Sequence, residues 1–118
     1  PEVDNSWKWA GGGFISTTED VARFLWQHAE ASYLTTESLS ELTTPQQTNS
    51  GESTNYGLGW SNRKDAQGNR LIGHTGGSVG GTTFAFMQPN SRVVVVMTTN
   101  VSSASFGNLA NDLFALYR

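Results

Sequence analysis

Residues 70–81, RLIGHTGGSVGG, give the strongest indication of the fold. They also raise the question of why a β-sheet would place a histidine beside so many glycines. The stretch holds five glycines and a histidine, and both of its ends continue into sequence typical of β-strands. A turn between two strands needs one or two glycines. Five glycines predict that another group must come close to this backbone, because a residue without a Cβ atom permits such an approach.

Strand-like stretches around this segment predict an antiparallel β-meander over residues 55–99. The expected strands are residues 55–61, 70–75, 82–88 and 92–100. Gly68 and Asn69 are expected at the tip of the first hairpin, because both residue types favour turns. The apolar run at residues 93–97 lacks alternation, which predicts a strand that is buried on both faces.

Residues 17–44 are expected to be helical. Two capping boxes compete at the start of this segment: Thr17 with Asp20, or Ser16 with Glu19. Either one would satisfy backbone N–H groups that the first helical turn leaves without partners.

The first of these helices has one apolar face at helical spacing. Its members are Val21, Phe24, Leu25 and His28. His28 lies at the edge of this stripe and is therefore expected to be a partly buried structural residue rather than a catalytic one. A second helix is expected to start after Thr35, which would cap it, and to stop at Pro45.

The chain closes with a predicted helix over residues 103–117, which carries an apolar stripe. The residues around the glycine triplet at 11–13 are expected to be extended. These elements predict an α+β fold in a single domain over residues 1–118. Its core would be an antiparallel sheet of three to four strands with helices packed on it, including the C-terminal helix.

Composition excludes several classes of function. The formal net charge is −3 and the seven basic residues are scattered, so no stripe for nucleic acid exists. The chain has no cysteine and only two histidines, far apart, so we expect no metal site and no cofactor. The longest apolar run is too short to span a bilayer.

Residues 74–77, His-Thr-Gly-Gly, carry the chemistry expected of this chain. Glycines at the edge of a strand let a flat ligand lie against the backbone and pair with its N–H and C=O groups. The Thr75 hydroxyl can bind a carboxylate or a carbonyl, and His74 can donate a hydrogen bond or share in proton transfer. Such groups favour recognition of an acyl or amide substrate.

Residues 73–100, GHTGGSVGGTTFAFMQPNSRVVVVMTTN, resemble the C-terminal segment of the serine β-lactamase and penicillin-binding protein superfamily. The class C β-lactamase-like and esterase branch looks closest. AGGGFISTTEDVARFL at residues 10–25 is similar to the family's glycine-rich stretch before a helix, and YGLGW at residues 56–60 to its strand ahead of the triad. The resemblance implies part of a β-lactamase/transpeptidase-like fold.

The resemblance also implies a role for each residue of this strand end. His74 takes the place of the family's usual lysine, with a proton-transfer or electrostatic role. Thr75, Gly76, Gly77 and Ser78 would bind the substrate, and the backbone N–H of Gly77 would complete the oxyanion hole. Because an unperturbed histidine is mostly neutral at pH 7, histidine in place of lysine favours an esterase or peptidase over an enzyme for anionic β-lactams.

The family's nucleophile belongs to a Ser-x-x-Lys motif at the start of a buried helix. SNRK at residues 61–64 leaves a strand and enters a hairpin turn, and STN at residues 53–55 lies in a loop where the family has no catalytic group. Both matches are therefore rejected. We expect the chain to be roughly the last third of a serine acyl hydrolase (a β-lactamase, esterase or D-peptidase), inactive alone. A stand-alone peptide- or acyl-binding module, or an interaction domain, is the alternative.

The expected partners are an acyl, β-lactam, ester or peptide substrate and the missing N-terminal part of the parent enzyme. A strand at residues 93–97 with an unpaired edge would also favour pairing with a second copy of the chain. By resemblance, the parent protein is expected in the periplasm or outside the cell.

Overall fold

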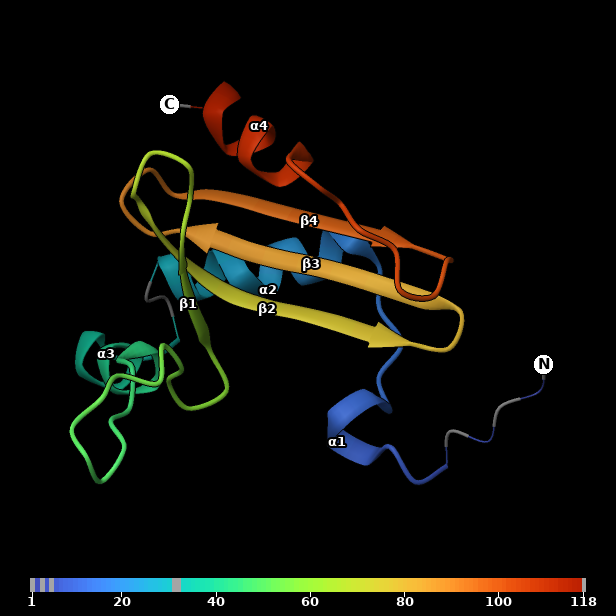
Figure 1. The fold of residues 1–118 in the computed structure, drawn as a ribbon, viewed down its shortest axis with the longest axis horizontal. Coiled ribbons are helices and arrows are strands. Elements are labelled where there is room, and N and C mark those ends of the chain that lie inside the picture. The colour runs from blue at the N-terminus through green and yellow to red at the C-terminus, as the bar shows by residue number, and fades with distance from the viewer. Residues whose placement is uncertain (1, 3, 5, 31–32, 118) are drawn as a thin grey trace.

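The computed structural model describes the chain except residues 1, 3, 5, 31–32 and 118. Its centre is a four-stranded antiparallel sheet in the order β1-β2-β3-β4 (Figure 1). The strands are β1 (Ser61–Lys64), β2 (Arg70–Ser78), β3 (Gly81–Gln88) and β4 (Val93–Thr99). The helices are α1 (Trp9–Gly12), α2 (Thr18–Ala29), α3 (Thr36–Thr43) and α4 (Leu109–Leu116). This architecture confirms the predicted α+β fold with its C-terminal helix.

Alternating side chains divide the sheet into two faces that contact different helices. On one face α4 covers the main hydrophobic core, formed by Leu71, Phe84, Phe86, Val95, Ala110 and Phe114. On the other face α2 packs against β3 and β4, behind the sheet in Figure 1. Leu25 and His28 are the buried residues of α2. Successive residues of β2 therefore face different helices.

β4 is an edge strand, because only β3 pairs with it among the described residues. The prediction of an unpaired edge at residues 93–97 is thus confirmed. The expected burial of this strand on both faces is only partly correct. Val95 is buried against α4, whereas its neighbours along the strand are half-buried.

Four predicted boundaries are wrong. The strand expected over residues 70–75 continues to Ser78, because β3 pairs with it that far. Three others differ as well, and backbone torsions explain two of them. The strand expected over residues 55–61 begins only at Ser61, because Asn55 (φ 55°) and Gly59 (φ 85°) bend the chain before it. The helix expected from residue 103 begins at Leu109, because Ser103 (φ 55°) and Gly107 (φ 52°) interrupt it.

The last boundary lies in the stretch expected to be extended. Residues Trp9–Gly12 form the single turn α1, and Gly13 caps it with a backbone hydrogen bond to the Trp9 carbonyl oxygen. A Cβ atom at Gly13 would lie 2.4 Å from that oxygen. The glycine triplet therefore closes a helical turn.

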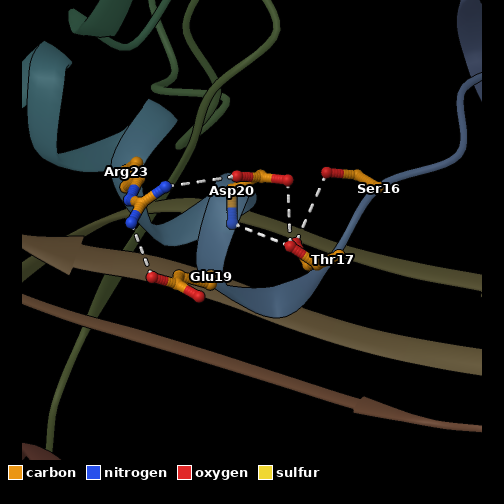
Figure 2. Close-up of polar contacts among 5 residues, drawn as sticks. All are labelled: Ser16, Thr17, Glu19, Asp20 and Arg23. Carbon is orange, nitrogen blue, oxygen red and sulfur yellow. Dashed lines mark hydrogen bonds and ion pairs between the residues drawn. The ribbon is translucent and has the colours of Figure 1, made fainter.

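The cap of α2 matches one of the two predicted boxes (Figure 2). The Thr17 hydroxyl accepts a hydrogen bond from the Asp20 backbone N–H at 3.1 Å and donates to the Asp20 carboxylate at 3.0 Å. Arg23 then pairs with Glu19 at 2.7 Å and with Asp20 at 3.7 Å. These exposed pairs each contribute less than about 1 kcal/mol, so the cap defines the start of the helix. The expected cap of α3 is also present, because Thr35 accepts from the Ser38 N–H.

Asp65 closes the β1–β2 hairpin with a buried carboxylate that is 7% exposed. Its Oδ1 atom accepts from the backbone N–H groups of Gln67 (2.9 Å) and Asn69 (2.8 Å). Its Oδ2 atom accepts from the side-chain amides of Asn69 (2.8 Å) and Gln88 (2.9 Å). Burial is the largest influence and raises the pKa of Asp65, but the four hydrogen bonds together outweigh it and hold this pKa below its usual range.

Replacing Asp65 with asparagine is expected to destabilise the fold by about 2 kcal/mol at pH 7, because the new amide would face two amide donors. A lowered folded-state pKa stabilises the fold above the unfolded value, about 3.9, and that contribution is lost as the pH falls through the folded value. Urea unfolding at about pH 7 and about pH 3 should therefore show a smaller loss in Asp65→Asn than in the unmodified chain. The exposed Glu52→Gln serves as the control, and an equal acid loss in Asp65→Asn would contradict this role.

Candidate active site

The residues 74–77 lie where β2 becomes an edge. β1 pairs with the first part of β2 and its last pair joins Ser61 to Gly73, whereas β3 pairs with β2 as far as Ser78. From His74 onward, no described strand lies on the β1 side of β2. His74, Gly76 and Gly77 are exposed there and Thr75 is half-buried. The predicted exposed edge is therefore present.

The register of the β2–β3 hairpin directs the backbone groups of two residues to this free side. Ser78 is paired with Gly81 across a two-residue connection, which requires these two residues to point their N–H and C=O groups at each other. Backbone groups alternate in direction along an antiparallel strand. The N–H and C=O groups of Thr75 and Gly77 therefore point away from β3, toward the free edge.

Packing and torsion explain Gly73 and Gly80 in this stretch but not Gly76, Gly77 or Gly81. A Cβ atom at Gly73 would lie 2.1 Å from the Ala85 carbonyl oxygen, so the approach of β3 requires glycine. Gly80 has a φ of +83°, which the turn requires. At Gly76 and Gly77 a Cβ atom would meet nothing within 4 Å, and neither residue has a positive φ. The fold itself gives no reason for these two glycines.

His74 lies on the α2 face of the sheet and touches two polar groups. Its Nδ1 atom is 2.5 Å from the Thr75 carbonyl oxygen, and its Nε2 atom is 2.9 Å from the Tyr56 hydroxyl. The Tyr56 ring meets the imidazole edge-on, with the ring centroids 5.6 Å apart. The imidazole therefore folds over the free edge of β2.

Two basic side chains approach the same edge from distant parts of the sequence. The Lys8 ammonium donates to the Ser78 hydroxyl at 2.6 Å, and α1 accordingly lies near the end of β2 in Figure 1. On the α4 face, Arg63 lies 3.4 Å from the Thr75 hydroxyl, with its guanidinium 5.0 Å from the centre of the Phe86 ring. The edge thus has positive charge at both ends.

A groove of about 440 Å³ adjoins the free end of β2. It is lined by Gly77, Ser78, Val79, Thr82, Ser102 and Ser103. A larger groove of about 600 Å³ lies between α2 and β4 and contains none of residues 74–78. The smaller groove is the relevant one for chemistry, because hydroxyl groups line it and it touches the Gly77 backbone.

The match to known proteins decides the family of this chain. The family model described as Beta-lactamase matches residues 1–117. The chain belongs to the beta-lactamase family. This confirms the resemblance found in the sequence.

Two relatives of this beta-lactamase-family chain are much longer proteins. The chain is 30% identical to the human serine beta-lactamase-like protein LACTB, mitochondrial, over 114 residues that cover 75% of this chain and 21% of that protein. The bovine protein of the same name is also 30% identical, over 75% of this chain and 20% of its own length. The chain thus spans about a fifth of the length of these relatives.

A solved structure shares the fold. The D-stereospecific amidohydrolase from Streptomyces sp. superposes with a TM-score of 0.66 at 24% identity, over 85% of this chain and 29% of that one. At this level of identity the likeness concerns the fold alone.

The two serine motifs set aside in the sequence remain unsuited to the family's chemistry. Residues Ser61–Lys64 form strand β1 itself, which corrects the expectation that they enter a turn. Ser61 is half-buried opposite Gly73, and no helix begins there. Ser53 lies in a loop, in an isolated bridge with Gln47. Neither serine starts a buried helix in this beta-lactamase-family chain.

His28 is a packing residue in the family fold. It is 4% exposed and lies against the rings of Phe24, Tyr33 and Trp60. Elsewhere in the described residues, no group of three His, Cys, Asp or Glu side chains could hold a metal ion. Nor is any helix in the described part of the chain long and apolar enough to cross a membrane.

Sequence reasoning missed Tyr56, Lys8 and Arg63 as members of this edge. Tyr56 was noticed only as part of the YGLGW block, 18 residues before His74. Lys8 is 70 residues from Ser78, and no local pattern links them. Arg63 could have been inferred once the β1–β2 register was known, because it pairs with Leu71 and so shares the face of Thr75.

Proposed function

We propose that this chain forms the substrate-binding edge of a serine acyl hydrolase, either a β-lactamase, an esterase or a D-peptidase. One observation carries the proposal. Gly76 and Gly77 are exposed and required by neither packing nor torsion, and the backbone groups of Gly77 point to the free side of β2. An acyl substrate lying along this edge would explain both glycines, because a side chain at either position would occupy the space that the substrate needs.

Each group at the edge then has a chemical task. The Gly77 N–H donates to the carbonyl oxygen of the substrate, where negative charge develops as the tetrahedral intermediate forms. The Thr75 and Ser78 hydroxyls hold polar groups on either side of that carbonyl. His74 replaces the family's lysine and accepts or returns a proton close to the reacting bond.

The nucleophile is proposed to lie outside this chain, in a Ser-x-x-Lys motif of the longer protein. Its hydroxyl oxygen would form an ester bond with the acyl carbon, the leaving group would depart with the proton, and water would later hydrolyse the ester. The small share of LACTB that this chain covers is consistent with this division. The missing part would also cover the free edge of β4. Location in the periplasm or outside the cell stays a proposal from the resemblance, and the two LACTB relatives are named as mitochondrial.

Replacing Gly77 with proline in the complete protein is expected to lower kcat for a chromogenic ester or cephalosporin by about 10²–10³, the usual cost of one oxyanion-hole donor. Proline removes the N–H group, which faces the free edge and is not needed by β3. Gly77→Ala keeps this N–H and is the matched control, with a much smaller expected loss.

Equal losses in both variants would mean that the position needs space rather than a donor, and unchanged turnover in Gly77→Pro would contradict the proposed oxyanion hole. Urea midpoints of both variants check that the fold is intact. A complete protein that binds acyl compounds but never turns them over would favour the binding-module alternative.

A further inference from the structure

The chain has two tyrosine–histidine pairs in very different surroundings. Tyr33 lies against His28, which is a buried residue of α2. Tyr56 lies against His74 at the exposed edge of β2, with its hydroxyl 2.9 Å from Nε2. The first pair belongs to the packing of the fold, whereas the second lies among the groups proposed to bind substrate.

Hydrogen-bond chemistry defines the protonation of the exposed pair. The Thr75 carbonyl oxygen can only accept, so the Nδ1 atom of His74 must carry the proton that lies between them. In a neutral imidazole the other nitrogen is then an acceptor, and the Tyr56 hydroxyl donates to it. Both contacts are satisfied by a single tautomer, with the proton on Nδ1.

The backbone of Tyr56 is held by contacts that do not involve His74. Its carbonyl oxygen accepts from the Gln46 N–H at 2.8 Å, and the residue forms an isolated bridge with Ser61. The next residue, Gly57, passes so close to α3 that a Cβ atom there would lie 2.3 Å from the Leu42 carbonyl oxygen. The hydroxyl is therefore presented from a backbone whose position is already determined.

We propose that Tyr56 is a positioning residue: its hydroxyl donates to Nε2 of His74, which selects the Nδ1–H tautomer and fixes the orientation of the imidazole at the substrate edge. The role of this pair toward a substrate rests on the proposed function, whereas the tautomer itself can be measured without it. A lysine at position 74 would offer only donors and a positive charge. The Tyr56–His74 pair is instead neutral, which suits an uncharged ester or amide, and it can relay a proton: the Tyr56 oxygen would take a proton from an attacking hydroxyl while its own proton passes to Nε2.

The test is ¹⁵N NMR of the imidazole nitrogens, because the chain has only His28 and His74. At about pH 8.5, where imidazole is ordinarily neutral, His74 should show the Nδ1–H tautomer. Tyr56→Phe removes only the hydroxyl and should lower the Nδ1–H to Nε2–H ratio of His74 about fivefold, as expected for one ordinary hydrogen bond. The matched control Tyr33→Phe should alter the signals of His28 and leave those of His74 unchanged.

Two results would overturn the proposal. One is a majority Nε2–H tautomer at His74 in the unmodified chain, and the other is an unchanged tautomer ratio in Tyr56→Phe. An unchanged urea midpoint in Tyr56→Phe separates positioning from a general loss of structure. The NMR measurement needs no turnover. Unchanged turnover in Gly77→Pro would therefore contradict the proposed oxyanion hole without affecting the tautomer result. An unchanged tautomer ratio in Tyr56→Phe would likewise leave the proposed hydrolase untouched.

Discussion

Replacing Gly73 with alanine is expected to lower the free energy of unfolding by at least about 3 kcal/mol, at the upper limit of ordinary overpacking. The added Cβ atom would lie 2.1 Å from the Ala85 carbonyl oxygen and 2.6 Å from the Phe86 Cα atom. Both are backbone atoms of the strand that pairs with β2, so no side chain can rotate to make room. The strands must separate locally, which breaks the ladder next to His74.

Urea unfolding followed by tryptophan fluorescence measures this effect. Gly76→Ala and Gly77→Ala are the matched controls, since each adds the same methyl group to β2 where it meets nothing within 4 Å. We expect their unfolding free energies to stay within about 0.5 kcal/mol of the unmodified chain. A Gly73→Ala variant as stable as these controls would show that β2 and β3 do not approach as closely as described.

Replacing Phe86 with alanine is expected to cost about 3–5 kcal/mol, the range for a fully buried aromatic residue. Phe86 is 0% exposed and lies at the centre of the core between the sheet and α4. Its ring packs 4.6 Å from that of Phe84, and the Arg63 guanidinium covers it. Removing the ring leaves a cavity and also frees the cation that approaches Thr75.

The same unfolding measurement separates burial from residue type. Phe14 is 83% exposed, so Phe14→Ala should change stability by less than about 0.5 kcal/mol. If both variants lost equal stability, the core would not be centred on β3 and α4.

The core elements could be predicted from the sequence because their signals are local. The apolar run at residues 84–87, the valine run in β4 and the Thr17 cap each depend on neighbours within a few positions. The start of α4 could not, because the left-handed torsion of Ser103 has no local signal in that residue type. Asn55 interrupts the expected first strand, and here the signal was available, because asparagine adopts left-handed torsions more readily than most residues.

The residues of the candidate site also fall into two groups, those that the sequence predicted and those that only the structure reveals. Residues 74–78 were identified through the His-Thr-Gly-Gly pattern and the family resemblance, and the edge on which they lie is present. Tyr56, Lys8 and Arg63 were not, since each reaches the edge through tertiary contacts across many residues. The division between glycines needed for packing and glycines left free also required coordinates, because Gly73 and Gly76 look alike in the sequence.

The sequential order of the strands has a consequence for how the molecule assembles. Each strand pairs with its nearest neighbour along the chain, and only two residues connect β2 to β3. Closing short loops costs little chain entropy, and topologies of low contact order fold rapidly. The sheet can therefore form hairpin by hairpin, with Asp65 organising the first turn. The largest loss of chain entropy then occurs when α2 docks on the sheet, because its partners in β3 and β4 lie more than fifty residues away along the chain.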